Sequence, residues 1–253
     1  MKGIVFQKPL EFVLEIQGES WTQGQALQGE LRIRNHSSNE LPIGAVQLLI
    51  AYGQTKKVRL KAADAFEHLS ELSVISIPEK LGPQKQWVLP WKYQLGINAP
   101  ITDAGGSLYL LYGKGDLGQL QLNVLPDPVI QEIIQVIEVQ LRFVRKSQKF
   151  QKGAHKDFIE TKFAPPNAKG FALVEQLVLS AKFENEQLKL NYEFQVKSIS
   201  ASAAAVEIKK EKRSFEQLFK NSELKTQSGR FNFEHLEPAV RGIFTQVESK
   251  VVF

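Results

Sequence analysis

The stretch of residues 20–34 constrains the fold of this chain more than any other. It is typical of a turn that enters a β-strand, with Gly24 and Gly29 five residues apart. Glycine adopts positive φ angles at no steric cost, so Gly24 suits a tight turn and Gly29 suits a bend or bulge at the start of a strand. Leu31 and Ile33 then alternate with two arginines, which is the period of a strand with one buried face.

The rest of the first half repeats this pattern. Residues 10–17 alternate apolar and polar side chains, and Trp87, Trp91 and Tyr93 place large rings on one face of another strand. One short segment, residues 62–70, is a helix candidate. Regularly spaced short strands separated by Gly, Pro, Asn and Asp predict an antiparallel β-sandwich. The remaining strand candidates are residues 45–51, 56–61, 72–77, 107–112 and 120–124.

A chain of 253 residues is long enough for two domains of roughly 100–150 residues each. The stiff tripeptide at residues 126–128 marks the boundary, because proline fixes φ and restricts the residue before it. We therefore predict domains at residues 1–126 and 127–253. Isoleucines at helical spacing follow, with Asp127 as N-cap and Pro128 at the first helical position. They favour a short linker helix, and the alternative is a bulged strand.

The second half returns to β-structure. Residues 177–196 form the clearest hairpin of the chain, because each arm alternates apolar and polar residues around Asn185 and Glu186. We expect another strand at residues 206–213 and a short helical turn at residues 214–219. Apolar residues three and four apart from Leu236 to Val251 predict a C-terminal helix, which Gly242 weakens by ~1 kcal/mol relative to alanine.

Several short motifs resemble proteins of the arrestin class. Residues 24–31 resemble the PGE-x-V-x-G-x-V entry of arrestin-type N-terminal domains, and residues 91–102 resemble their F-x-F-x-L-P…P-x-T segment. The V-x-P-x-P linker matched by residues 124–128 is similar to that of the bacterial sporulation-control (SpoOM-type) family. Gln23 stands where that pattern has proline, and residues 112–116 replace an Asp-rich stretch.

The resemblance implies an all-β fold of two arrestin-like antiparallel β-sandwich domains, with a short linker helix and a C-terminal helix. It also implies a non-catalytic scaffold or regulator. The residues themselves offer no catalytic site, because the chain has no cysteine and no nucleophile elbow, Walker loop or dinucleotide fingerprint. The four histidines form no paired zinc motif. We therefore predict no enzyme activity, no cofactor and no metal.

The strongest candidate site is a basic stripe at residues 142–156, which carries six Lys and Arg residues and no acid. Such a stripe suits an acidic protein segment or an anionic membrane surface, and the alternative is an ordinary solvated strand face. Nucleic acid is not expected, since few aromatic residues interleave the cations. The six residues are Arg142, Arg145, Lys146, Lys149, Lys152 and Lys156.

These observations together predict a cytoplasmic adaptor that recognises protein partners through strand addition at a sheet edge or through the basic stripe. We expect a cytoplasmic location because the chain has no cysteine, no signal-like N-terminus and no window near the ~18 apolar residues of a membrane span. The alternative is a carbohydrate- or anionic-lipid-binding β-sandwich module, which an exposed Trp21 beside a cleft would favour. Self-association into a homo-oligomer is left open.

Overall fold

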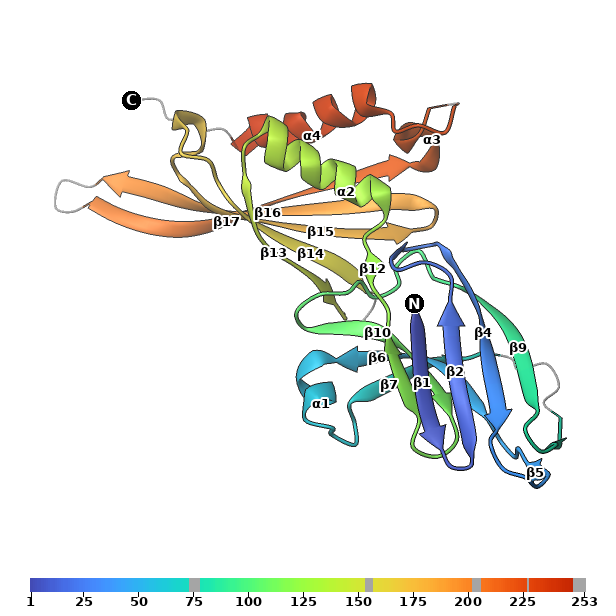
Figure 1. Cartoon of the computed structure of the whole chain (residues 1–253). Helices are drawn as coiled ribbons and strands as arrows, with labels where there is room; N and C mark the ends of the chain where they lie inside the picture. Colours follow the sequence, from blue (N-terminus) through green and yellow to red (C-terminus); the bar gives the residue numbers. More distant parts are fainter. Residues whose placement is uncertain (73–77, 153–156, 202–205, 227, 248–253) are drawn as a thin grey trace. The chain divides into compact units, whose positions relative to one another are not determined.

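The computed structural model describes residues 1–72, 78–152, 157–201, 206–226 and 228–247, without the side chains of residues 198–208. Figure 1 shows a chain built mainly of antiparallel strands with few helices. The all-β class predicted from the sequence is therefore confirmed. The chain divides into two compact units, Met1–Leu125 and Pro126–Phe253.

Unit 1 is a β-sandwich of two four-stranded antiparallel sheets. Unit 1 also contains two small sheets of two-residue strands, in which β3 pairs with β12 and β5 pairs with β8. The first sheet has the order β1 (Lys2–Gln7), β2 (Leu10–Ile16), β4 (Ala26–Asn35), β9 (Gln86–Gln94). The second has the order β11 (Gly118–Gln121), β10 (Gly106–Gly113), β6 (Gln47–Gln54), β7 (Phe66–Glu71). The short strands are β3 (Trp21–Thr22), β5 (Leu41–Pro42), β8 (Lys80–Leu81) and β12 (Val124–Leu125).

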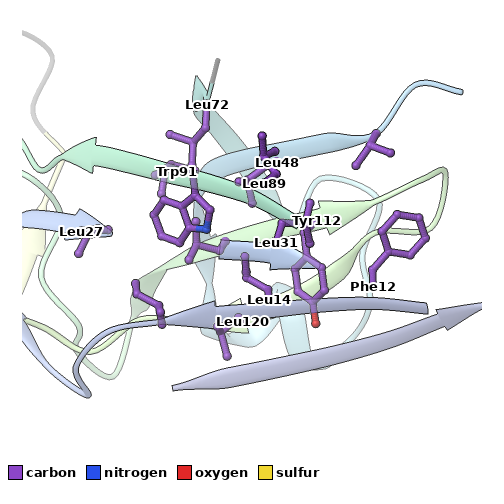
Figure 2. Close-up of a cluster of buried hydrophobic side chains, with 14 of the residues drawn as sticks. Phe12, Leu14, Leu27, Leu31, Leu48, Leu72, Leu89, Trp91, Tyr112 and Leu120 are labelled. Carbon is purple, nitrogen blue, oxygen red and sulfur yellow. The ribbon is translucent and has the colours of Figure 1, made fainter. Parts of the chain in front are cut away.

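The core of unit 1 fills the space between its two sheets, as Figure 2 shows. Phe12 and Leu31 come from the first sheet, and Tyr112 comes from the second. Gly24 has a φ angle of +76°, as expected for a turn. Gly29 lies within β4, where a Cβ would overlap the Glu15 carbonyl oxygen, so the close approach of two backbones requires glycine there.

One part of unit 1 differs from the sequence prediction. Residues 56–61 were expected as a strand but form the helix α1 (Thr55–Arg59) and its end. Residues 62–70, the predicted helix, lead instead into β7. The alternation of Val58 and Leu60 with cations covers too few residues to separate the two periods, and Leu60 faces solvent. Of the predicted strand at residues 72–77, only Leu72 lies within the described residues.

Unit 2 contains one five-stranded antiparallel sheet, with the strands in chain order. Two helices lie along one face of it (Figure 1): α2 (Pro128–Gln135), which continues into the π-helical turn η1 (Val136–Gln140), and α4 (Phe233–Val247). Two short helical turns complete the unit, η2 (Lys169–Phe171) and α3 (Asn221–Leu224). The strands are β13 (Val144–Gln151), β14 (Phe158–Ala164), β15 (Val174–Glu184), β16 (Gln187–Ala201) and β17 (Val206–Lys220).

The linker helix and the hairpin of unit 2 follow the sequence prediction. The Asp127 carboxylate accepts a hydrogen bond from the Val129 N–H at 2.8 Å, so Asp127 caps α2. Strands β15 and β16 pair across Asn185 and Glu186, and their alternate apolar residues are buried. Residues 214–219 continue β17 instead of forming a helical turn.

The second layer of unit 2 also differs from the prediction. The sequence predicted a second sandwich, whereas the described residues of this unit form a single sheet covered by helices. The apolar stripes of α2 and α4 supply the layer that a second sheet would have supplied, because either kind of element can cover an apolar sheet face. Phe244 of α4 makes this contact, with its ring centroid 5.3 Å from that of Phe194 on β16.

Candidate binding surface

The basic stripe lies along β13, which is an edge strand of the sheet of unit 2. Strand β14 pairs with one side of β13, and no strand among the described residues pairs with the other. Arg142 precedes the strand and has a φ angle of +57°. The pairing with β14 shifts by one residue between Arg145 and Ser147, which makes Lys146 the extra residue of a β-bulge.

The fold does not bring all six predicted cations together. Arg142, Arg145, Lys146, Lys149 and Lys152 are exposed, whereas Lys156 lies outside the described residues. The alternation of a strand separates the others, because neighbouring side chains point to opposite faces. The candidate site is therefore a strand edge with cations on both sides, and not one continuous patch.

Cross-strand partners show which face each cation occupies. Arg145 lies opposite the buried residue Phe163, so its side chain is on the face that the helices cover. There its Nε atom is 3.2 Å from the Glu138 carboxylate of η1. Lys149 lies opposite Glu160 and is on the other face. The sequence stripe contains no acid, yet the fold brings these two carboxylates to it from other elements.

Most cations elsewhere on this sheet are paired with carboxylates. The Glu175 carboxylate contacts two lysines, and these contacts lower its pKa. The hydrogen bond from Lys210 is the largest cause, followed by that from Lys197. Two of these pairs involve Lys210 and Lys212, which belong to a second, shorter basic run at residues 209–213. The pairs are Lys162–Glu160 (3.4 Å), Lys189–Glu216 (2.6 Å), Lys197–Glu175 (3.2 Å), Lys210–Glu175 (2.9 Å) and Lys212–Glu193 (2.9 Å).

The edge of the sheet is different. Among the described residues, no ion pair involves Arg142, Lys146 or Lys149. These three exposed cations therefore concentrate the positive charge of the sheet at β13, and we name them the β13 cations. A bulge and lysines on an edge strand also oppose the pairing of a further strand. The side chains of β13 are thus better suited to recognition than its backbone.

The features that would favour a sugar-binding module are not seen. Trp21 is only 3% exposed and presents no open ring face. Unit 1 does carry a shallow cleft of about 1000 Å³ beside Gly29 and Trp91, but Trp91 is 8% exposed. Its indole N–H is buried and has no hydrogen-bond partner among the described residues. The indole rings of this unit therefore serve its core.

The histidines within the described residues do not gather into a metal site. His36 bonds the Glu11 carboxylate at 2.7 Å, and the ring of His235 packs edge-on against Phe219. His155 lies outside the described residues. In the part of the chain that the structure describes, no three His, Asp or Glu side chains are placed to hold a metal ion.

Sequence reasoning missed a second group of cations, on α1. The run of Lys and Arg at residues 56–61 was the available signal, but its interpretation as a strand hid it. No helix in the described part of the chain has the length and apolarity needed to cross a membrane.

A β-sandwich joined through a proline-bounded linker to a second β-rich unit defines an arrestin-like architecture. The chain is similar in structure to Spo0M, the sporulation control protein of Bacillus subtilis, with a TM-score of 0.66 and 14% identity over 94% of this chain and 98% of that one. This likeness confirms the SpoOM-type arrestin-like fold that the sequence motifs predicted.

A second solved structure matches less than half of this chain. It is the alkylpurine DNA glycosylase AlkC of Pseudomonas fluorescens bound to DNA with an abasic site analogue. Its TM-score is 0.28 at 9% identity, over 44% of this chain and 29% of that one. No family model and no curated protein matches the sequence.

Proposed function

We propose that this protein is a non-catalytic, cytoplasmic regulator that acts by binding other proteins, and that the β13 cations bind an acidic segment of its partner. A sporulation control protein shares its fold, which supports a regulatory role. The observation that carries the proposal is the contrast within one sheet. Most cations inside the sheet are paired with carboxylates, whereas no ion pair among the described residues involves the β13 cations.

An unpaired exposed cation is better placed than a paired one to bind an acidic partner. A cation that already has a carboxylate partner gains little from a second one, whereas an unpaired exposed cation is free to form a charge-assisted hydrogen bond. Arg145 is satisfied by Glu138 and contributes less. The bulge at Lys146 disfavours strand addition, so we assign recognition to the side chains.

The test is the affinity for a fluorescently labelled polyglutamate peptide, measured by anisotropy at low and high salt. Replacing Arg142, Lys146 and Lys149 with glutamine should weaken binding by about tenfold or more, because three charge-assisted contacts are lost. Added salt should weaken binding to the wild type, since exposed charges are screened. Glutamine is used because a glutamate at position 149 would face Glu160 and disturb the fold.

The matched control replaces three other exposed cations of unit 2, Lys169, Lys220 and Arg230, with glutamine. Both triple variants have the same net charge. If the control loses as much affinity as the β13 variant, binding reflects net charge alone and the proposed site is wrong. Unchanged binding by the β13 variant would also refute it.

A further inference from the structure

A second cationic surface lies on unit 1, in the connection between β6 and β7 (Figure 1). It consists of α1 and the turn that follows, residues 55–65, which we name the α1 loop. Lys56, Arg59 and Lys61 are exposed, and no ion pair among the described residues involves them. Leu60 lies between the last two and is 71% exposed, the highest value for a large apolar side chain in the described part of the chain.

The backbone holds Leu60 and Lys61 outward in a defined geometry. The N–H groups of Lys61 and Ala62 donate to the carbonyls of Val58 and Lys57 at 3.1 and 3.0 Å, which closes the end of α1. This arrangement places Lys61 in the left-handed region, with a φ angle of +51°. Glycine is the residue that this position ordinarily favours, because any Cβ is strained there. The chain therefore carries a cation where a glycine would be less strained.

Other contacts anchor the α1 loop to the sandwich. The Thr55 N–H donates to the Gly105 carbonyl at 2.9 Å, and Ala65 is buried. Lys57 pairs with Asp64 at 2.5 Å, and this contact lowers the pKa of Asp64. One of the four cations is thus neutralised within the loop. Of the other three, Arg59 and Lys61 flank the exposed leucine in the chain, and Lys56 lies one helical turn before it.

An exposed apolar side chain with unpaired cations close to it in the chain matches the chemistry of an anionic lipid surface. Lysine and arginine are attracted to the negative headgroup layer, and an aliphatic side chain gains by leaving water for the boundary below it. An acidic peptide would satisfy the cations but leave Leu60 in water. We infer that the α1 loop docks on an anionic membrane surface, with Leu60 entering the headgroup region and Lys56, Arg59 and Lys61 contacting phosphate groups.

The experiment measures co-sedimentation of the full chain with phosphatidylcholine vesicles, with and without phosphatidylserine, at low salt. We expect binding only when phosphatidylserine is present. Replacing Lys56, Arg59 and Lys61 with glutamine should reduce affinity by about a hundredfold, since each cation contributes about fivefold. Leu60→Ser should reduce it by about tenfold, because the buried apolar area is lost.

Two controls match these changes. Leu69→Ser alters a leucine that is 43% exposed in the same hairpin but outside the α1 loop. Replacing Lys8, Lys85 and Lys92 with glutamine removes three exposed cations of unit 1 from other loops and strands. Both controls should bind within about twofold of the wild type. If a control variant loses as much vesicle affinity as the corresponding variant of the α1 loop, the inference is wrong.

Lys61→Gly separates binding from folding. Glycine relieves the left-handed strain, so the melting temperature should stay the same or rise, while vesicle binding should fall by about fivefold. A Lys61→Gly variant that binds like the wild type would show that the cation has no part in docking. Leu60→Trp provides a direct signal, because its emission should shift to shorter wavelength on vesicles if this position enters the headgroups.

Two other outcomes would contradict insertion of Leu60 or place the membrane contact at the β13 edge. If the cation variant loses binding but Leu60→Ser does not, the contact is purely electrostatic and insertion is wrong. The variant of the β13 cations should bind vesicles like the wild type. If that variant loses vesicle binding and the α1 variants keep it, the membrane surface is the β13 edge and the α1 loop is excluded.

Discussion

Phe244 organises the core of unit 2, so its removal tests how this unit is held together. Its ring is fully buried and makes edge-on contacts with four other rings. Truncation of a buried phenylalanine to alanine costs about 3–5 kcal/mol, and edge-on ring pairs add to the loss of buried area. We therefore expect Phe244→Ala to cost about 5 kcal/mol. The four centroid distances are 5.2 Å to Phe143, 5.3 Å to Phe194, 6.1 Å to Tyr192 and 6.3 Å to Phe171.

The distribution of tryptophan makes a specific assay available. Trp21, Trp87 and Trp91 all lie in unit 1, so tryptophan fluorescence reports the unfolding of that unit, whereas far-ultraviolet circular dichroism reports both. In guanidinium chloride, Phe244→Ala should move the part of the dichroism transition due to unit 2 to lower denaturant by roughly 1 M. The fluorescence midpoint should not change.

Gln246→Ala is the control for this prediction, because Gln246 lies on the exposed side of the same helix. Its midpoints should both match those of the wild type. If Phe244→Ala shifts the fluorescence midpoint as much as the dichroism, the two units unfold as one cooperative body and the prediction of two independent domains is wrong. If neither midpoint moves, Phe244 does not stabilise a packed core.

Two further predictions concern single positions. Gly29→Ala should lower the fluorescence midpoint of unit 1 strongly, since its Cβ would overlap the Glu15 carbonyl oxygen, and an unchanged midpoint would contradict this close approach. Burial raises the pKa of Tyr192 above the unfolded value near 10. The stabilisation that the buried neutral phenol gives to the folded state is therefore complete below about pH 10 and is lost as the pH rises further. Tyr192→Phe should lower the stability of unit 2 by about 1 kcal/mol at neutral pH, because the hydrogen bond to Gln217 is lost. Above pH 10 the variant should lose less stability with rising pH than the wild type. If dichroism shows that the wild type and Tyr192→Phe lose stability in parallel above pH 10, the alkaline loss does not come from Tyr192.

Periodicity predicted the parts of the fold in which the alternation is long. The β15–β16 hairpin has ten or more residues in each arm, and a register error of one residue would expose its whole apolar face. Residues 56–61 offered only two apolar side chains, and nothing local distinguished strand from helix. The covering of the unit 2 sheet by helices was equally hidden, because the sequence shows that a face is apolar but not which element covers it.

The candidate sites show the same limit in terms of charge. A run of six cations without an acid looks unneutralised along the chain. In the structure, however, Glu138 of a helical turn pairs with Arg145, whereas Glu160 of the neighbouring strand lies opposite Lys149 but pairs with Lys162. Coulomb attraction depends on distance in space, so the acids that decide whether a lysine is free are often far away in the sequence. Among the described residues, Arg142, Lys146 and Lys149 are the cations of the β13 stripe that no ion pair involves. The same comparison leaves Lys56, Arg59 and Lys61 of the α1 loop, close to the exposed Leu60, without an ion pair among the described residues.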